Sequence, residues 1–134
     1  MKRQSFVALL LLLPLGTLVW AQTDTLPDGL GKAIQSPEGL RKVIERKDPR
    51  FVIVDVRSPA EYREGHIPTA INIPDGVTAN IKNPPPKDKY LVVYCRGGMK
   101  SPAACEKLQA DGYKHVFVWG GIVKWPYPQA VSPQ

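Results

Sequence analysis

The chain has 134 residues, of which 43% are apolar and 22% are charged. This composition suits one small globular domain with a single hydrophobic core, and it excludes both a disordered chain and a two-domain enzyme. Its 18 basic and 12 acidic residues are interspersed, which gives a net charge of +6 without a long basic run. We therefore predict no nucleic-acid-binding surface, whereas the mild positive bias favours anionic small molecules.

The first 21 residues have the pattern of a secretory signal peptide. Lys2 and Arg3 precede an apolar stretch that ends just before Ala21. Pro14 interrupts this stretch, which is shorter than the roughly 20 apolar residues that a membrane-spanning helix needs. We expect cleavage after residue 21, a periplasmic or secreted mature protein, and no attachment to a membrane afterwards. An uncleaved segment that anchors the protein is the alternative.

The regular helix and strand patterns lie between residues 32 and 128, and we predict one domain over this range. Residues 22–31 and 129–134 show no such pattern, so they are expected to be a loose N-terminal segment and a loose C-terminal tail. Residues 75–89 also lack a period and contain consecutive prolines, which indicates a surface connection within the domain.

Three Ser-Pro pairs mark the expected helix starts, at Ser36-Pro37, Ser58-Pro59 and Ser101-Pro102. Serine caps the first free N–H groups of a helix, and proline fits its first turn. The middle pair is followed by Glu61, which completes a capping box of the Ser-x-x-Glu type. Apolar residues at helical spacing follow the first and third pairs, and Gly112 supplies a stop for the last helix.

Short apolar runs alternate with these helices and predict buried strands. Alternating strands and helices form an α/β fold in which helices flank a parallel central sheet. Ala33-Ile34 is a possible short extra strand, so we expect about five strands. In such sheets ligands bind outside the carboxyl ends of the strands. The four longer runs are residues 51–54, 70–73, 91–94 and 116–119.

Cys95 ends one of these strands and begins a glycine-containing loop that leads into a helix. In this arrangement successive backbone N–H groups and the positive end of a helix dipole point towards the sulfur. Arg96 and Lys100 add positive charge, and each of these effects favours thiolate over thiol. Cys95 is thus the candidate nucleophile, and the binding loop comprises Arg96, Gly97, Gly98, Met99, Lys100 and Ser101.

The other cysteine and the histidines have simpler interpretations. A buried structural Cys95 would not need a basic glycine loop after it, whereas Cys105 shares an apolar helical face and is expected in the core. A resolving or redox role for Cys105 is the alternative. A disulfide between a strand end and the following helix is geometrically awkward. Because His66 and His115 are isolated in the sequence, we predict no metal site.

Three blocks of sequence, in order, resemble the single-domain rhodaneses, sulfurtransferases that carry sulfur as a cysteine persulfide. They are residues 55–62 with 65–70, residues 95–100, and residues 120–125. The resemblance covers residues 33–125 and implies a rhodanese fold in which Cys95 carries the sulfur. Thr69 stands where the family usually has glycine, and Lys100 where arginine is frequent; these departures leave substrate preference open.

The resemblance implies sulfur transfer from thiosulfate or another sulfane donor, through a Cys95 persulfide, to cyanide or a thiol acceptor, with no cofactor. A persulfide relay that serves a partner protein is the alternative. Phosphatases and arsenate reductases of related fold have an arginine where this sequence has Ser101. Since serine lacks the guanidinium fork that clasps phosphate, these activities are disfavoured.

Other residues near strand ends are candidates for support of the pocket. Asp55 and Arg57 follow a strand, but structural hydrogen bonds or ion pairs are the favoured role, with Glu61 as a candidate partner. Trp125 could wall the pocket or pack in the core. Tyr94 precedes the nucleophile on its strand, so its side chain should point to the opposite face of the sheet.

Overall fold

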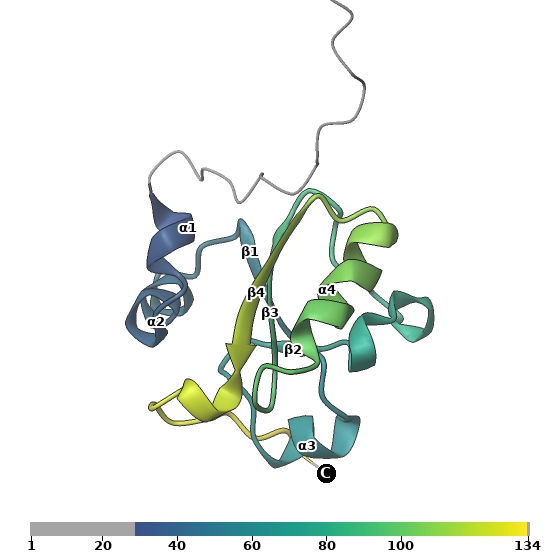
Figure 1. Cartoon of the computed structure of the whole chain (residues 1–134). Helices are drawn as coiled ribbons and strands as arrows, with labels where there is room; N and C mark the ends of the chain where they lie inside the picture. Colours follow the sequence, from purple (N-terminus) through teal and green to yellow (C-terminus); the bar gives the residue numbers. More distant parts are fainter. Residues whose placement is uncertain (1–28, 134) are drawn as a thin grey trace, which may run out of the picture.

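A computed structural model describes residues 29–133 of the chain (Figure 1). The expected signal peptide, residues 1–21, and the first part of the expected loose segment lie outside these residues. Within residues 29–133, no helix combines the length and apolar character needed to cross a membrane. The elements, with η marking short 3-10 helices, are α1 Leu30–Ala33, α2 Pro37–Glu45, β1 Phe51–Asp55, α3 Pro59–Glu64, β2 Ile71–Asn72, η1 Pro74–Gly76, η2 Thr78–Asn80, β3 Tyr90–Cys95, α4 Ser101–Ala110, β4 His115–Gly121 and η3 Ile122–Lys124.

The predicted α/β fold with a parallel central sheet is confirmed. In the described part of the chain the sheet has four strands in the order β2-β1-β3-β4, and every neighbouring pair is parallel. All four longer runs identified in the sequence form strands of this sheet. Because parallel strands share one direction, their carboxyl ends meet at a single edge, towards the bottom of Figure 1.

The possible fifth strand at Ala33-Ile34 is wrong. Ala33 ends the short helix α1, which begins inside the segment expected to be loose, and Ile34 caps that helix with helical dihedral angles. Ile34 is nevertheless fully buried. Its carbonyl accepts a hydrogen bond from the indole N–H of Trp119 at 2.8 Å. Ile34 therefore holds the end of α1 against the sheet and does not extend the sheet, whereas Ala33 is exposed.

Two of the three Ser-Pro helix starts are capped as expected. Ser36 accepts a hydrogen bond from the backbone N–H of Gly39, and Ser58 forms the full capping box with Glu61. The third start differs, because α4 begins at Ser101 and Lys100 is its N-cap without a side-chain cap. The Ser101 hydroxyl is thus free for the loop that follows Cys95.

Separate hydrophobic clusters cover the two faces of the sheet. Figure 1 shows α1 and α2 on one side and α4 on the other. Tyr94 belongs to the cluster with Trp119 and Ile34, whereas Cys95 belongs to the cluster with Cys105 on α4. The prediction that Tyr94 and Cys95 point to opposite faces is therefore confirmed.

A β-bulge sets the register at the carboxyl end of β3 and β4. Val93 pairs with Val118, but the next residue, Tyr94, pairs with Gly120, so that Trp119 is an extra residue on β4. A bulge increases local twist and redirects side chains. Here it places Gly121, without a side chain, directly beside Cys95.

The end of the chain is attached to the domain, unlike the loose tail expected from the sequence. Ala130 and His66 exchange two backbone hydrogen bonds, each 2.9 Å long, as an antiparallel bridge. The backbone N–H of Ser132 also donates to the carbonyl of Arg63. Polar backbone pairing of this kind needs no periodic side-chain pattern, which is why the sequence did not reveal it.

Candidate active site

Cys95 lies at the carboxyl end of β3, and only 3% of its surface is exposed. The chain then turns through residues 96–100 before α4 begins. The backbone N–H of Gly98 donates a hydrogen bond to the Cys95 Sγ at 3.0 Å. The strand, glycine loop and helix start predicted from the sequence thus surround the sulfur as expected.

This environment lowers the pKa of the Cys95 thiol below its usual value of 9.0. Burial acts in the opposite direction, but hydrogen bonding from the backbone N–H groups of Lys100, Ser101 and Gly98, with help from the Ser101 hydroxyl, outweighs it. These donors favour the charged form because they replace the water that a thiolate loses on burial. The backbone donors therefore favour the thiolate form of Cys95.

Glycines allow the loop to pack directly against the end of β4. Gly98 has φ 97°, a conformation that other residues rarely adopt. A Cβ atom on Gly121 would lie 2.4 Å from the carbonyl oxygen of Arg96 and 2.7 Å from Gly97 backbone atoms. The two backbones therefore touch, and Gly121 fixes how closely the loop approaches β4.

Further hydrogen bonds from Ser101 and Val123 hold the loop in place. The Ser101 hydroxyl lies 3.2 Å from the carbonyl oxygens of both Gly98 and Gly120. The backbone N–H of Val123 donates to the carbonyl of Arg96. Consequently the segment after β4 packs against the loop. The sequence indicated this segment only as a turn between tryptophans.

The Arg96 guanidinium is paired with Glu61 of α3. Its Nε donates to Glu61 Oε1 at 2.9 Å, and its terminal nitrogen contacts the same oxygen. This pair, followed by the bonds from Ser58, lowers the pKa of the Glu61 carboxyl to about 2. The sequence indicated that Arg96 adds positive charge beside the thiolate; in the structure this charge is paired with the Glu61 carboxylate.

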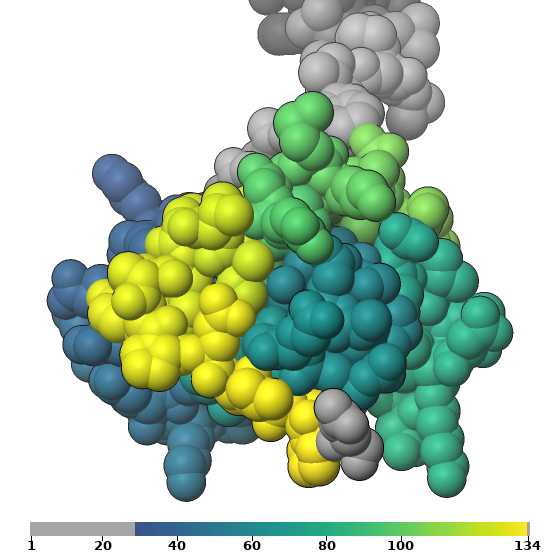
Figure 2. Space-filling model, turned by 90° about the horizontal axis from the view of Figure 1, so that it is seen from below, coloured from purple at the N-terminus to yellow at the C-terminus, as the bar shows by residue number. Residues whose placement is uncertain are grey.

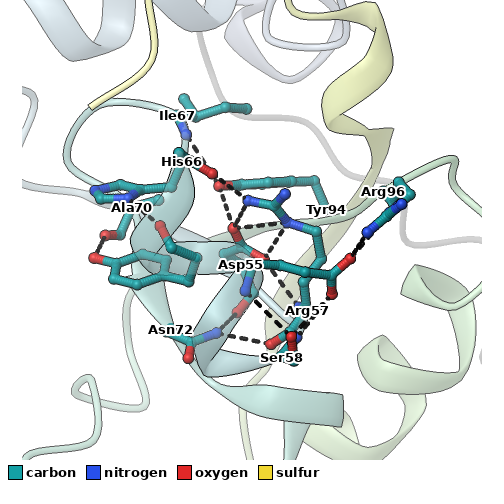
Figure 3. A network of polar contacts seen from close by, with 12 residues as sticks. Asp55, Arg57, Ser58, His66, Ile67, Ala70, Asn72, Tyr94 and Arg96 are labelled. Atoms are coloured by element: carbon teal, nitrogen blue, oxygen red, sulfur yellow. Dashed lines mark hydrogen bonds and ion pairs between the residues drawn. The ribbon is translucent and has the colours of Figure 1, made fainter. Parts of the chain in front are cut away.

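Asp55 and Arg57 form a buried polar network under the site (Figure 3). The guanidinium of Arg57 contacts both Asp55 carboxylate oxygens, with a closest distance of 2.6 Å, and also donates to the carbonyl of Gly65. The Tyr94 hydroxyl donates to Asp55 at 2.7 Å and accepts from the N–H of Ile67. Glu61 is not the partner of this pair, contrary to the sequence-based suggestion, while the structural role favoured for Asp55 and Arg57 fits the observed contacts.

A pocket of about 440 Å³ opens beside Cys95. Figure 2 views this edge of the sheet, where the green of the loop meets the yellow of the segment after β4 and the blue-green of α3. Arg57 lines the pocket, whereas the fully buried Asp55 does not. The lining residues are Val56, Arg57, Ser58, Pro59, Glu61, Pro74, Asp75, Cys95, Arg96, Gly97, Met99 and Lys100.

Sequence reasoning missed the apolar lining and Asp75. Pro74 and Asp75 come from η1, at the start of a stretch without any period. Their position next to Cys95 follows from the sheet order, because β2 and η1 lead past the carboxyl end of β1. The general rule that ligands bind at this edge was the one signal that could have suggested them.

Three other candidates are not among the residues that line the pocket. Trp125 is buried against Trp119 and Tyr127, which supports the core-packing alternative and not a pocket wall. His66 is also buried; its Nδ1 lies 2.8 Å from the carbonyl oxygen of Tyr62. Burial raises the pKa of Cys105 to about 12, which makes it a poor nucleophile.

Among residues 29–133, no group of three or more histidine, cysteine, aspartate or glutamate side chains is placed to hold a metal ion. The site described above is therefore built from a single thiol, backbone N–H groups and charged side chains. These groups are suited to covalent chemistry at sulfur.

Comparison with known families agrees with this geometry. The family described as Rhodanese-like domain matches residues 36–126, which include the loop and every residue that lines the pocket. The chain belongs to this rhodanese-like family. Several of its relatives are named sulfurtransferases, which supports sulfurtransferase activity in general, and others are named tRNA uridine(34) hydroxylases.

Individual relatives extend over most of the rhodanese-like domain. The putative sulfurtransferase YtwF of Bacillus subtilis is 38% identical over 90 residues, covering 67% of this chain and 86% of that protein. A thiosulfate:glutathione sulfurtransferase of Saccharomyces cerevisiae is 31% identical, covering 63% and 70%. The crystal structure of a rhodanese-like domain protein from Staphylococcus aureus matches with a TM-score of 0.62 and 29% identity, covering 73% and 96%.

Proposed function

We propose that this protein transfers sulfane sulfur through a persulfide on Cys95. In the first half-reaction the Cys95 thiolate attacks the outer sulfur of thiosulfate. A new S–S bond forms, the S–S bond of thiosulfate breaks, and sulfite leaves with the electron pair. In the second, cyanide or a thiolate attacks the outer sulfur of the persulfide and restores the Cys95 thiolate. Such covalent catalysis gives ping-pong kinetics.

The observation that carries the proposal is the set of backbone N–H groups around the Cys95 sulfur. Gly98 donates to Sγ at 3.0 Å, and together with Lys100 and Ser101 it lowers the thiol pKa. Donors fixed in this way stabilise a thiolate, and also the negative charge that develops as sulfur is transferred, without reorganisation. The relative from Saccharomyces cerevisiae, named for thiosulfate and glutathione, supports thiosulfate as the donor and a thiol as the acceptor.

A relay to a protein partner is a second candidate, and it has its own supporting observation. Met99 of the loop is 90% exposed, and Val123, whose backbone binds the loop at Arg96, is 74% exposed. Exposed apolar side chains next to a reactive group are typical of a contact surface for another protein. The relay predicts slow discharge to small acceptors and fast discharge to one cognate protein.

Phosphatase and arsenate reductase activities have no such support. Ser101 occupies the position where those enzymes need arginine, and its hydroxyl is bonded to the loop and to β4.

Export to the periplasm or the cell exterior is a further part of the proposal. The argument for it rests on the sequence of residues 1–21, which lie outside the residues that the structure describes. Fractionation of cells, together with the N-terminal sequence of the native protein, tests it.

The experiment that tests the function is intact-mass spectrometry of the reduced protein before and after addition of thiosulfate, then after cyanide. The expected result is a gain of one sulfur, reversed by cyanide with release of thiocyanate. Cys95→Ser should gain no sulfur, while the matched control Cys105→Ala should gain it like the native protein. Absence of a sulfur adduct from both thiosulfate and polysulfide would overturn the proposal.

A further inference from the structure

The pocket beside Cys95 is lined by five charged side chains, three of which are already engaged. Arg57 is paired with Asp55, and Arg96 is paired with Glu61. Asp75 and Lys100 remain; neither makes an ion pair or a side-chain hydrogen bond to another residue of 29–133. The free charges of the pocket are thus one carboxylate and one ammonium group.

The position of Asp75 is fixed by its backbone. Its N–H donates to the carbonyl of Val56 at 3.0 Å, which ties it to the chain after β1. The next residue, Gly76, packs so closely on α4 that an added Cβ would lie 2.6 Å from the carbonyl oxygen of Ala104. Asp75 itself is exposed and lines the pocket. The backbone of η1 therefore places Asp75 at the pocket, while its exposed side chain is open to a ligand.

The size and lining of the pocket also exceed what thiosulfate requires. A volume of about 440 Å³ lies in the range of pockets that hold small organic molecules. Val56, Pro59, Pro74 and Met99 contribute apolar surface. A small inorganic dianion would use neither this surface nor Asp75, whose negative charge would repel it.

We propose that Asp75 and Lys100 select an acceptor thiol that carries both an ammonium and a carboxylate group, that is, a small amino-acid-derived thiol. The ammonium group is recognised by Asp75 and the carboxylate by Lys100, while the carbon chain contacts the apolar lining. This inference rests on the proposed function, because it concerns the second half-reaction. Asp75 is a specificity-determining residue in this scheme, since it binds the acceptor but takes no part in sulfur chemistry.

The transfer step balances without another reagent. The acceptor thiolate attacks the outer sulfur of the Cys95 persulfide and forms a new S–S bond. The S–S bond to Cys95 breaks, and its electron pair remains on the Cys95 Sγ as the thiolate. The product is the persulfide of the acceptor, so no net oxidation or reduction takes place.

The test loads the full mature protein with thiosulfate, verifies the sulfur adduct by intact mass, removes the donor and measures discharge by four thiols. Cysteine carries both charges, cysteamine only the ammonium, 3-mercaptopropionate only the carboxylate, and 2-mercaptoethanol neither. Because these thiols differ in intrinsic reactivity, the quantity compared is the rate constant of each variant relative to native for the same thiol. The variants are Asp75→Asn, Lys100→Gln and the control Asp88→Asn, an exposed aspartate just before β3, at the opposite edge of the sheet.

In Asp75→Asn we expect discharge by cysteine and cysteamine to fall about threefold to fivefold relative to 2-mercaptoethanol, as is typical for loss of an exposed charge pair. Lys100→Gln should lower discharge by cysteine and 3-mercaptopropionate by a similar factor. Asp88→Asn should show neither change. An equal effect of Asp75→Asn on all four thiols, no effect on any, or the same selectivity in Asp88→Asn would overturn the inference. Failure of the native protein to load sulfur would instead overturn the proposed function, and the inference with it.

Discussion

Replacing Gly121 by alanine should displace the loop that holds the Cys95 sulfur. The new Cβ would lie 2.4 Å from the carbonyl oxygen of Arg96 and 2.7 Å from backbone atoms of Gly97. These neighbours are backbone and cannot rotate away, so the loop has to retreat by at least about 0.6 Å to reach an acceptable separation of 3.0 Å. Overpacking of this kind destabilises a fold by about 1–3 kcal/mol.

In a domain of roughly 100 residues that loss lowers Tm by about 5–15 °C, which differential scanning calorimetry measures directly. Sulfur loading from thiosulfate should also slow by about tenfold to a hundredfold, because displacement of reacting groups by an ångström has effects of this order. Loading is followed by intact mass at a temperature where the variant is fully folded.

The matched control is Gly97→Ala, in the same loop. Nothing lies within 4 Å of a Cβ added there, and its backbone needs no left-handed conformation. Its Tm should therefore stay within about 2 °C of native, as for most exposed substitutions. If Gly121→Ala matched the control in both Tm and loading rate, the close approach of β4 would not determine the position of the loop.

Four further predictions concern single groups. The rate of sulfur loading from thiosulfate should rise with pH through an inflection below pH 9.0, because the folded protein lowers the pKa of Cys95 and the reactive thiolate predominates above that pKa. An inflection at or above pH 9.0 would contradict this prediction. Ser101→Ala should shift that inflection to higher pH, measured in the same assay, since its hydroxyl helps to lower the pKa. Tyr94→Phe should lower the free energy of unfolding by about 1–3 kcal/mol in urea titrations, because the buried Asp55 carboxylate loses a hydrogen bond; an unchanged value would remove the Tyr94 hydroxyl from the network. Thr69→Gly should raise Tm by about 4–8 °C, because Thr69 has φ 71° and relief of that strain is worth about 1 kcal/mol, and an equal or lower Tm would refute it.

The main strands and the nucleophile could be predicted from the sequence because their signals are local. Four apolar runs each carried a strand pattern, and Cys95 stood between a strand and a glycine loop. Ala33-Ile34 could not be assigned, because two apolar residues suit a strand or a helix end equally well. The contact that decides the matter, the bond from Trp119 to the carbonyl of Ile34, joins residues far apart in the chain.

The charged partners of the site could not be assigned for a related reason. Arg57 and Arg96 are both within reach of acidic residues along the chain, and the sequence does not say which carboxylate each one meets. The structure pairs Arg57 with Asp55 and leaves Glu61 for Arg96. Asp75 escaped notice because its place at the pocket depends on the order of the strands and not on any pattern around it.

The support of the Cys95 sulfur by backbone N–H groups has a consequence for how such proteins diversify. Every amino acid except proline carries this donor, so substitutions at the exposed positions 96, 99 and 100 leave these backbone donors in place. The side chains of Arg96, Met99 and Lys100 are exposed and make no contribution to the donors themselves. Mutations at these positions can therefore alter the choice of sulfur donor or acceptor while the nucleophile keeps working, which gives selection a route to new specificities without an inactive intermediate.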